Sequence, residues 1–233
     1  MITQNKLKQN LGRLLSSSFI IAALLLSPLG FAASYNAVTA TDYLLNHSGN
    51  PWSTMALASV NAAAIPSEYL KTVSGSSAIN FEAPILAITS INQDPKTFGA
   101  TDYIAKLKSF HSAGQIGDTS TLNDDIFGIL ALVSVGEPLG DPVISDSKKF
   151  LLNHQNSDGG WAFAVGGTSD SNTTASALVA LASVGLAATN TQIQNALNYL
   201  KTAQKTDGGL TYDPTSSFGT DSDSSSTAWL LWA

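Results

Sequence analysis

The sequence of 233 residues contains no cysteine. It therefore has no disulfide, no thiolate metal ligand and no cysteine nucleophile. Its three histidines lie at spacings that do not match a metal site, so we expect no metal, zinc included, and no cofactor. None of the many serines lies in the Gly-x-Ser-x-Gly turn that carries the nucleophile in many hydrolases. The sequence thus gives no support to a metalloenzyme or a serine hydrolase.

The sequence also has no apolar run that is convincing as a membrane span. The run over residues 19–26 is too short for one, since about 20 residues are needed. Three basic residues precede it (Lys6, Lys8 and Arg13), and the small residues Gly30 and Ala32 follow it. This pattern is typical of a signal peptide over residues 1–32, cleaved after Ala32. An uncleaved signal anchor is the alternative. We expect an exported protein, whether secreted, periplasmic or held at the cell surface.

Positive charge is scarce in the remaining chain. Removal of residues 1–32 leaves eight lysines, no arginine and all 17 acidic residues, a net charge of about 8 − 17 = −9. Without arginine there is no bidentate clamp for phosphate, and a negative surface repels polyanions. We therefore expect no nucleic-acid partner and little affinity for anionic lipid.

Residues 33–233 repeat a unit of two helices joined by a glycine turn. In the clearest copy, a short apolar stripe ends near Gln155, and Asp158-Gly159-Gly160 is expected to cap that helix. A second helix is expected over residues 173–184, with Asn172 as its N-cap. This second helix carries almost no charge, which is typical of a helix surrounded by other helices.

The spacing of the copies is regular. Asp158-Gly159-Gly160 and Asp207-Gly208-Gly209 lie 207 − 158 = 49 positions apart, as do Gln155 and Gln204. The apolar segments 129–136 and 178–185 have the same offset. Looser copies of the second helix cover residues 55–61, 85–92 and 227–233, and first helices are expected near residues 42, 68, 102, 150 and 199. The period predicts an all-α fold of five helical hairpins, with loops at residues 112–121 and 136–146.

Residues 150–161 resemble a known repeat: Phe-Leu, three residues, Gln155, three residues, then Gly159-Gly160-Trp161. This pattern is similar to the QW repeat of squalene–hopene and oxidosqualene cyclases. Residues 199–210 form a second copy, with Leu210 in the tryptophan position. The wider group resembled is the α/α-toroid superfamily of terpene cyclases, protein prenyltransferases, complement-type thioester domains and cobalamin carriers. In this family the Gln and Trp of the repeat tie one helix pair to the next, a structural role that the resemblance assigns to Gln155, Trp161 and Gln204.

The resemblance implies limits on chemistry as well as a fold. The zinc site of protein prenyltransferases includes a cysteine and a thioester needs one, so neither is expected here. The last segment, residues 227–233, aligns with the middle of an inner helix and has no cap. We therefore expect an incomplete toroid over residues 33–233, truncated at its C-terminus.

Acidic residues near the inner helices raise the question of catalysis. Class II terpene cyclases protonate an alkene or epoxide with a DxDD motif at the start of an inner helix. Asp221 and Asp223 match the first part of this motif, but a serine replaces the final Asp and the following Thr-Ala lies two residues too far along. Residues 123–125 and 172–174 occupy equivalent edges. Helix capping explains all three groups without a substrate.

Two functions remain open. The first is an exported, non-catalytic repeat module that binds a large ligand, a glycan or a protein. The second is a class II terpene cyclase, an isomerase of polyprenyl chains, with Asp223 and Asp221 as its acids. The signal segment, the broken motif and an aromatic content of only 8% favour the first, because cyclases stabilise cations with aromatic rings.

Overall fold

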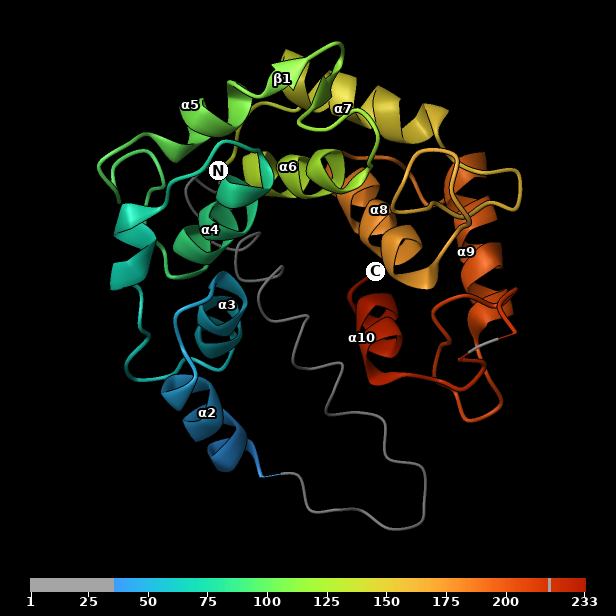
Figure 1. The fold of residues 1–233 in the computed structure, drawn as a ribbon, viewed down its shortest axis with the longest axis horizontal. Helices are drawn as coiled ribbons and strands as arrows, with labels where there is room; N and C mark the ends of the chain where they lie inside the picture. Colours follow the sequence, from blue (N-terminus) through green and yellow to red (C-terminus); the bar gives the residue numbers. More distant parts are fainter. Residues whose placement is uncertain (1–35, 218) are drawn as a thin grey trace, which may run out of the picture. The chain divides into compact units, whose positions relative to one another are not determined.

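The computed structural model describes residues 36–217 and 219–233, so the predicted signal peptide lies outside the described residues. The described chain forms two compact units, one of residues up to 107 with 134–136, the other of residues 108–133 with 137–233. Helices dominate both units, which confirms the predicted all-α class (Figure 1). In the part of the chain that the structure describes, no helix is both long enough and apolar enough to cross a membrane.

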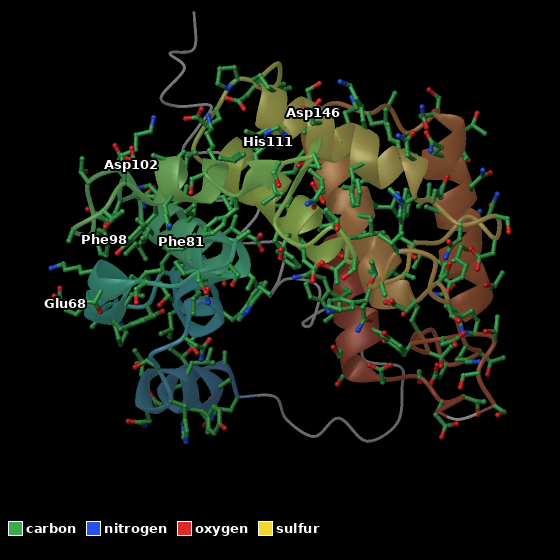
Figure 2. All side chains as sticks on the ribbon, turned by 45° about the horizontal axis from the view of Figure 1, so that its top comes forward. Glu68, Phe81, Phe98, Asp102, His111 and Asp146 are labelled. Atoms are coloured by element: carbon green, nitrogen blue, oxygen red, sulfur yellow. The ribbon has the colours of Figure 1, made fainter. Side chains whose placement is uncertain are left out.

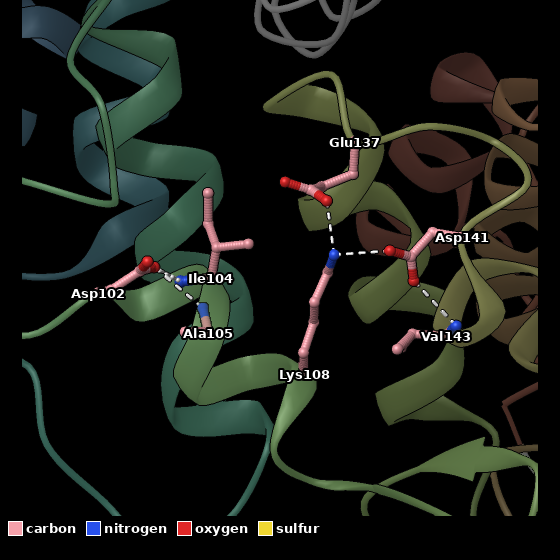
Figure 3. A network of polar contacts seen from close by, with 7 residues as sticks. All are labelled: Asp102, Ile104, Ala105, Lys108, Glu137, Asp141 and Val143. Carbon is pink, nitrogen blue, oxygen red and sulfur yellow. Dashed lines mark hydrogen bonds and ion pairs between the residues drawn. The ribbon is translucent and has the colours of Figure 1, made fainter.

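The first unit holds two helix pairs and the helix that follows them: α2 (Ala37–Asn46), α3 (Pro51–Ser59), η1 (Glu68–Thr72), α4 (Ile79–Ser90) and α5 (Tyr103–Lys108, whose last residue falls in the second unit). Tyr103 connects three of these elements. Its hydroxyl donates to the Leu70 carbonyl at 2.9 Å, and its ring lies 5.9 Å from that of Phe81, which Figure 2 labels. Asp102 caps α5 by accepting the N–H groups of Ile104 and Ala105, both at 2.9 Å (Figure 3).

The second unit holds the remaining helices: α6 (Asn123–Ser134, whose last residue falls in the first unit), α7 (Pro142–Asn153), α8 (Ser171–Ser183), α9 (Thr191–Ala203) and α10 (Ser224–Trp232). The pattern of burial separates two kinds of helix. α9 buries Ile193, Ala196, Tyr199 and Leu200, the spacing of a helix with one covered face. α8 is buried at every residue from 174 to 181 and contacts both α9 and α10 (Figure 1). α8 is therefore an inner helix, as predicted, and α9 an outer one.

The helix pairs follow one another in the predicted order, but several predicted boundaries were wrong. α7 begins at Pro142, inside the predicted loop 136–146, because proline is well tolerated at the first helical position. α8 begins at Ser171 with Asp170 as its cap, so Asn172 is a helical residue and caps nothing. The predicted loop 112–121 contains part of a short antiparallel hairpin, β1 (His111–Ser112) and β2 (Gln115–Ile116).

The prediction that Asp158-Gly159-Gly160 caps the first helix was also wrong. α7 ends at Asn153, and His154 is its C-cap residue. The imidazole Nδ1 of His154 hydrogen-bonds the Phe150 carbonyl at 2.8 Å, which satisfies a helix-end carbonyl without a glycine. Asp158-Gly159-Gly160 forms a separate turn, in which Gly159 has φ of 91°.

Candidate functional site

The inner helices α8 and α10 of the second unit begin in the same way. Asp170 caps α8 by accepting the N–H of Thr173 at 2.7 Å, and Asp223 caps α10 by accepting the N–H of Ser226 at 2.8 Å. Asp221 is exposed and lies before the helix. The structure thus places Asp223, a candidate acid in the sequence, in a position where its carboxylate satisfies free backbone amides.

A second bond recurs at all three inner helices of this unit. The Thr174 hydroxyl accepts the Trp161 N–H at 2.9 Å, and the Thr227 hydroxyl accepts the Leu210 N–H at 3.0 Å. In α6 the same bond is made by a carboxylate, because Asp125 Oδ1 accepts the Ile116 N–H at 3.0 Å. This repeated bond fixes which residues of the three helices are equivalent. Asp125 occupies a position that threonine fills in the next two repeats.

The alignment allows the acid motif to be compared at equivalent positions of the three helices. The four residues are Asp-Ser-Asn-Thr at 170–173, Asp-Ser-Ser-Ser at 223–226, and Thr-Leu-Asn-Asp at 121–124. Only the first acid is present at α8 and α10, and there it caps the helix. Among the described residues of this unit, no inner helix begins with the acidic series that the motif requires.

Asp125 is the most perturbed carboxyl near these helix starts, and the sequence marked it only as a possible capping residue. It is fully buried, and this burial raises its pKa to about 7. The nearby Asp124 charge acts in the same direction, while the nearby Ser147 hydroxyl and the hydrogen bond from the Ile116 N–H oppose it. One feature of the sequence indicates this site: Asp125 is an acid at a position where the next two repeats have threonine.

Asp170 connects two loops. It is 3% exposed, and its carboxylate accepts the N–H and hydroxyl of Thr173. Burial raises its pKa, while the Thr173 bonds and the nearby Tyr212 phenol and Phe163 backbone act to lower it. Phe163 belongs to the loop between α7 and α8, and Tyr212 to the loop between α9 and α10. One buried carboxylate therefore lies next to the loops of two successive repeats.

The glutamine and tryptophan of the repeat make contacts between layers and between helix pairs. Gln155 donates from Nε2 to the carbonyls of Gly159 and Gln192, both at 2.8 Å, and Gln192 lies in α9 of the next pair. Gln192 in turn donates to the Leu152 carbonyl at 2.7 Å. Trp161 is fully buried, and its indole N–H donates to the Leu151 carbonyl at 2.8 Å.

The two acidic turns repeat the same geometry. Asp158 accepts the Gly160 N–H at 2.9 Å and the Ser169 hydroxyl, and Asp207 accepts the Gly209 N–H at 3.0 Å and the Ser222 hydroxyl. Gln204 donates to the Gly208 carbonyl at 3.1 Å, as its counterpart does at Gly159. In the described structure these carboxylates stabilise turns.

Two further groups of charged side chains lie in the second unit. Lys108 contacts Glu137 and Asp141, and Asp141 also caps α7 by accepting the Val143 N–H at 2.9 Å (Figure 3). His111 Nε2 lies 3.3 Å from an oxygen of Asp146, beside the β1–β2 hairpin (Figure 2). Over residues 36–217 and 219–233, no three His, Asp or Glu side chains lie close enough together to hold a metal ion.

Comparison with known proteins agrees with this geometry. The squalene-hopene cyclase C-terminal domain family matches residues 100–233. No curated protein sequence matches the chain. One similar structure is the Candida albicans protein geranylgeranyltransferase-I complexed with GGPP, with a TM-score of 0.65 and 14% identity over 94% of this chain and 82% of that one.

A second similar structure is the ent-copalyl diphosphate synthase from Streptomyces platensis, with a TM-score of 0.60 and 14% identity over 95% of this chain. The chain spans about half (49%) of that protein. At such low identity both likenesses concern the fold, and they confirm the predicted helical-hairpin architecture of the α/α-toroid superfamily. The repeated helix pairs, the QW-like bonds and the family match lead to one conclusion: the chain belongs to the squalene-hopene cyclase C-terminal domain family.

Proposed function

We propose that this protein is an exported, non-catalytic member of its family that binds a large ligand. The observation that carries the proposal is the start of the inner helices in the second unit. Asp170 and Asp223 are committed to helix capping, and the residues after them are serine, asparagine and threonine. A carboxylic acid that protonates an alkene needs a neighbouring acid or hydrogen bonds that tune its proton affinity. These capping carboxylates lack an acidic neighbour within the motif, and the hydrogen bonds that they accept come from the first turns of their own helices.

Asp125 has a pKa raised to about 7, which suits acid catalysis near neutral pH. Its geometry supports a structural role instead. Oδ1 accepts the Ile116 N–H on β2, and the Ser147 hydroxyl of α7 lies beside the carboxyl. Its equivalents Thr174 and Thr227 make the same bond. A group directed at the neighbouring hairpin and helix is in the wrong place to protonate a ligand held by the inner helices.

The alternative is a class II cyclase of polyprenyl chains, and one observation favours it. Phe127 of α6 and Trp229 of α10 lie with ring centroids 6.0 Å apart, and Trp229 and Trp232 lie 5.4 Å apart. Aromatic rings on inner helices attract the cations that form during cyclisation. Rings alone do not start the reaction, because the first step requires a proton donor.

Export and the choice of partner complete the proposal. The N-terminal pattern of basic residues, apolar run and small residues supports export. The negative charge and the lack of arginine after residue 32 oppose binding of nucleic acid, and the lack of cysteine opposes a zinc site of the prenyltransferase kind. We propose a glycan, a protein or another large molecule as the ligand.

The test is incubation of the protein with squalene and shorter polyprenyl substrates, followed by analysis for cyclised products. We expect no product from the wild type or from Asp223→Asn, whose side-chain oxygen still caps the helix. A cyclised product that disappears in Asp223→Asn while the variant keeps its helix content would overturn the proposal and favour the cyclase.

A further inference from the structure

Two aromatic side chains are exposed at equivalent places in successive repeats. Phe163 is 54% exposed and Tyr212 is 49% exposed, although most large apolar residues of the second unit are buried. They lie 212 − 163 = 49 positions apart, which is the repeat period. Each follows the buried residue of the QW position by two, Trp161 in one case and Leu210 in the other. In these two repeats the fold therefore presents one exposed ring at this position.

The backbone holds the two rings by the same bond. The Leu122 N–H donates to the Phe163 carbonyl at 3.0 Å, and the Ser171 N–H donates to the Tyr212 carbonyl at 2.8 Å. Leu122 and Ser171 are themselves 49 positions apart, and each lies at the start of an inner helix. At each junction, the start of one inner helix thus holds the aromatic residue of the next repeat.

Asp170 adds a direct connection between the two positions. Its buried carboxyl lies close to the Phe163 backbone and to the Tyr212 phenol, since both act to lower its pKa. The Tyr212 backbone is held by the Ser171 N–H, while its ring stays half exposed. Phe163 is fixed through its backbone, which leaves its side chain available. A binding platform needs such rigid rings, because ordering a mobile side chain reduces affinity.

The surroundings of the rings are polar and acidic. Five further aspartates lie in the same two loops or their turns (Asp158, Asp207, Asp213, Asp221 and Asp223), with Lys205 as the one basic residue of these segments. Two exposed rings in segments rich in hydroxyls and carboxylates do not resemble the contiguous apolar core of a protein interface. Aromatic faces stack on the apolar faces of sugar rings, and carboxylates accept hydrogen bonds from sugar hydroxyls. The negative charge disfavours glycans that are themselves anionic.

We propose that Phe163 and Tyr212 form a platform for a neutral glycan chain, with one sugar ring stacked on each aromatic ring. The spacing by repeat suits a ligand that is itself a repeating polymer. This inference rests on the proposed binding function and names its ligand class. The nearby carboxylates would accept hydrogen bonds from sugar hydroxyls at the edges of the platform.

The experiment is affinity electrophoresis of the protein in gels containing xylan, mannan, soluble β-glucan or hydroxyethyl cellulose, with calorimetric titration of the matching oligosaccharide. We expect retardation by at least one of these polymers. Phe163→Ala and Tyr212→Ala should each weaken binding by about tenfold, and the double variant should migrate as if no polymer were present. Tyr212→Phe keeps the ring and should retain most of the affinity.

Leu139→Ala is the matched control, because Leu139 is 52% exposed but lies in the loop after the C-terminal end of α6. It should bind like the wild type. Circular dichroism and thermal unfolding of each variant identify any loss of binding that comes from misfolding. Retardation that survives in the folded double variant, or no retardation by any of these polymers, overturns the platform. Binding of a protein that is lost in the double variant would also overturn it and assign these rings to a protein partner. The cyclisation assay described above tests the non-catalytic function separately.

Discussion

Asp125 accepts the backbone N–H of Ile116 at 3.0 Å, in a position where the next two repeats use the hydroxyl of threonine. The aspartate makes the same bond, but unlike threonine it buries an ionisable carboxyl. Below its pKa the group is neutral and well suited to its surroundings. Above that pKa it places a charge among buried residues, which destabilises the folded state.

The replacement Asp125→Thr should remove a pH dependence of stability. The pKa of Asp125 is raised from 3.8 to about 7 in the folded protein, so its stabilising contribution is complete below pH 4 and is lost as the pH rises through 7. A shift of about three pKa units corresponds to at most about 4 kcal/mol. Urea unfolding should therefore show Asp125→Thr to be more stable than the wild type at pH 8. At pH 5 this advantage in unfolding free energy should be smaller.

The control for this prediction is Thr174→Ser, which keeps a hydroxyl in the equivalent position and should leave the pH profile of the wild type unchanged. If Asp125→Thr and the wild type lose stability in parallel between pH 5 and pH 8, the buried carboxyl is not the source of the dependence.

Gln155 and Gln204 form a matched pair for testing the bond between helix pairs. Gln155 is half-buried and donates to two carbonyls, one of them on α9, whereas Gln204 is exposed and donates to one. Gln155→Ala should lower the free energy of unfolding by about 1–3 kcal/mol, because the carbonyls of the buried Gly159 and the half-buried Gln192 lose this donor. Gln204→Ala should cost less than about 1 kcal/mol. Equal losses in the two variants would argue against the bridging role of Gln155.

Substitutions at Gly159 and Gly208 distinguish two costs of adding a side chain, backbone strain and steric overlap. Both have φ of 91°, which disfavours any residue with a Cβ. A Cβ at Gly159 would lie 2.6 Å from the Asn195 carbonyl oxygen, whereas a Cβ at Gly208 would meet nothing within 4 Å. Gly208→Ala should cost about 1–2 kcal/mol from backbone strain, and Gly159→Ala clearly more. Thermal unfolding of the two variants measures the difference, and the reverse order would contradict this account.

The buried ring of Trp161 and its indole hydrogen bond contribute separately to stability, and two variants distinguish these contributions. Trp161→Ala removes a fully buried indole and should cost about 3–5 kcal/mol. Trp161→Phe keeps an aromatic ring but leaves the Leu151 carbonyl without its 2.8 Å donor, so it should cost less than the alanine variant. Denaturant titration at one pH compares the two. A Trp161→Ala protein with wild-type stability that had lost glycan binding would place the residue in the binding surface instead.

The fold class could be predicted from the sequence because each repeat is marked by short local motifs at a regular spacing. The 49-residue offset and the QW-like spacing identified the helix pairs and the α/α-toroid class. Helix ends were predicted less well, since the choice between Asp170 and Asn172 as a cap depends on which side chain reaches the first free amides. The Asp125–Ile116 bond joins α6 to a hairpin that the sequence presented as a loop. Phe163 and Tyr212 share the repeat offset, but their exposure depends on how the loops fold.

The reciprocal bonds of Gln155 and Gln192 have a consequence for cooperativity. Gln155 donates to a carbonyl of α9, and Gln192 donates back to a carbonyl of α7. If either helix detaches, both lose a partner for a polar group that is partly shielded from water. Partial unfolding by separation of one hairpin is thereby made costly, as expected where neighbouring repeats are strongly coupled. Amide exchange in α7 and α9 should accordingly proceed through a shared opening event, with similar free energies for the slowest amides of both helices.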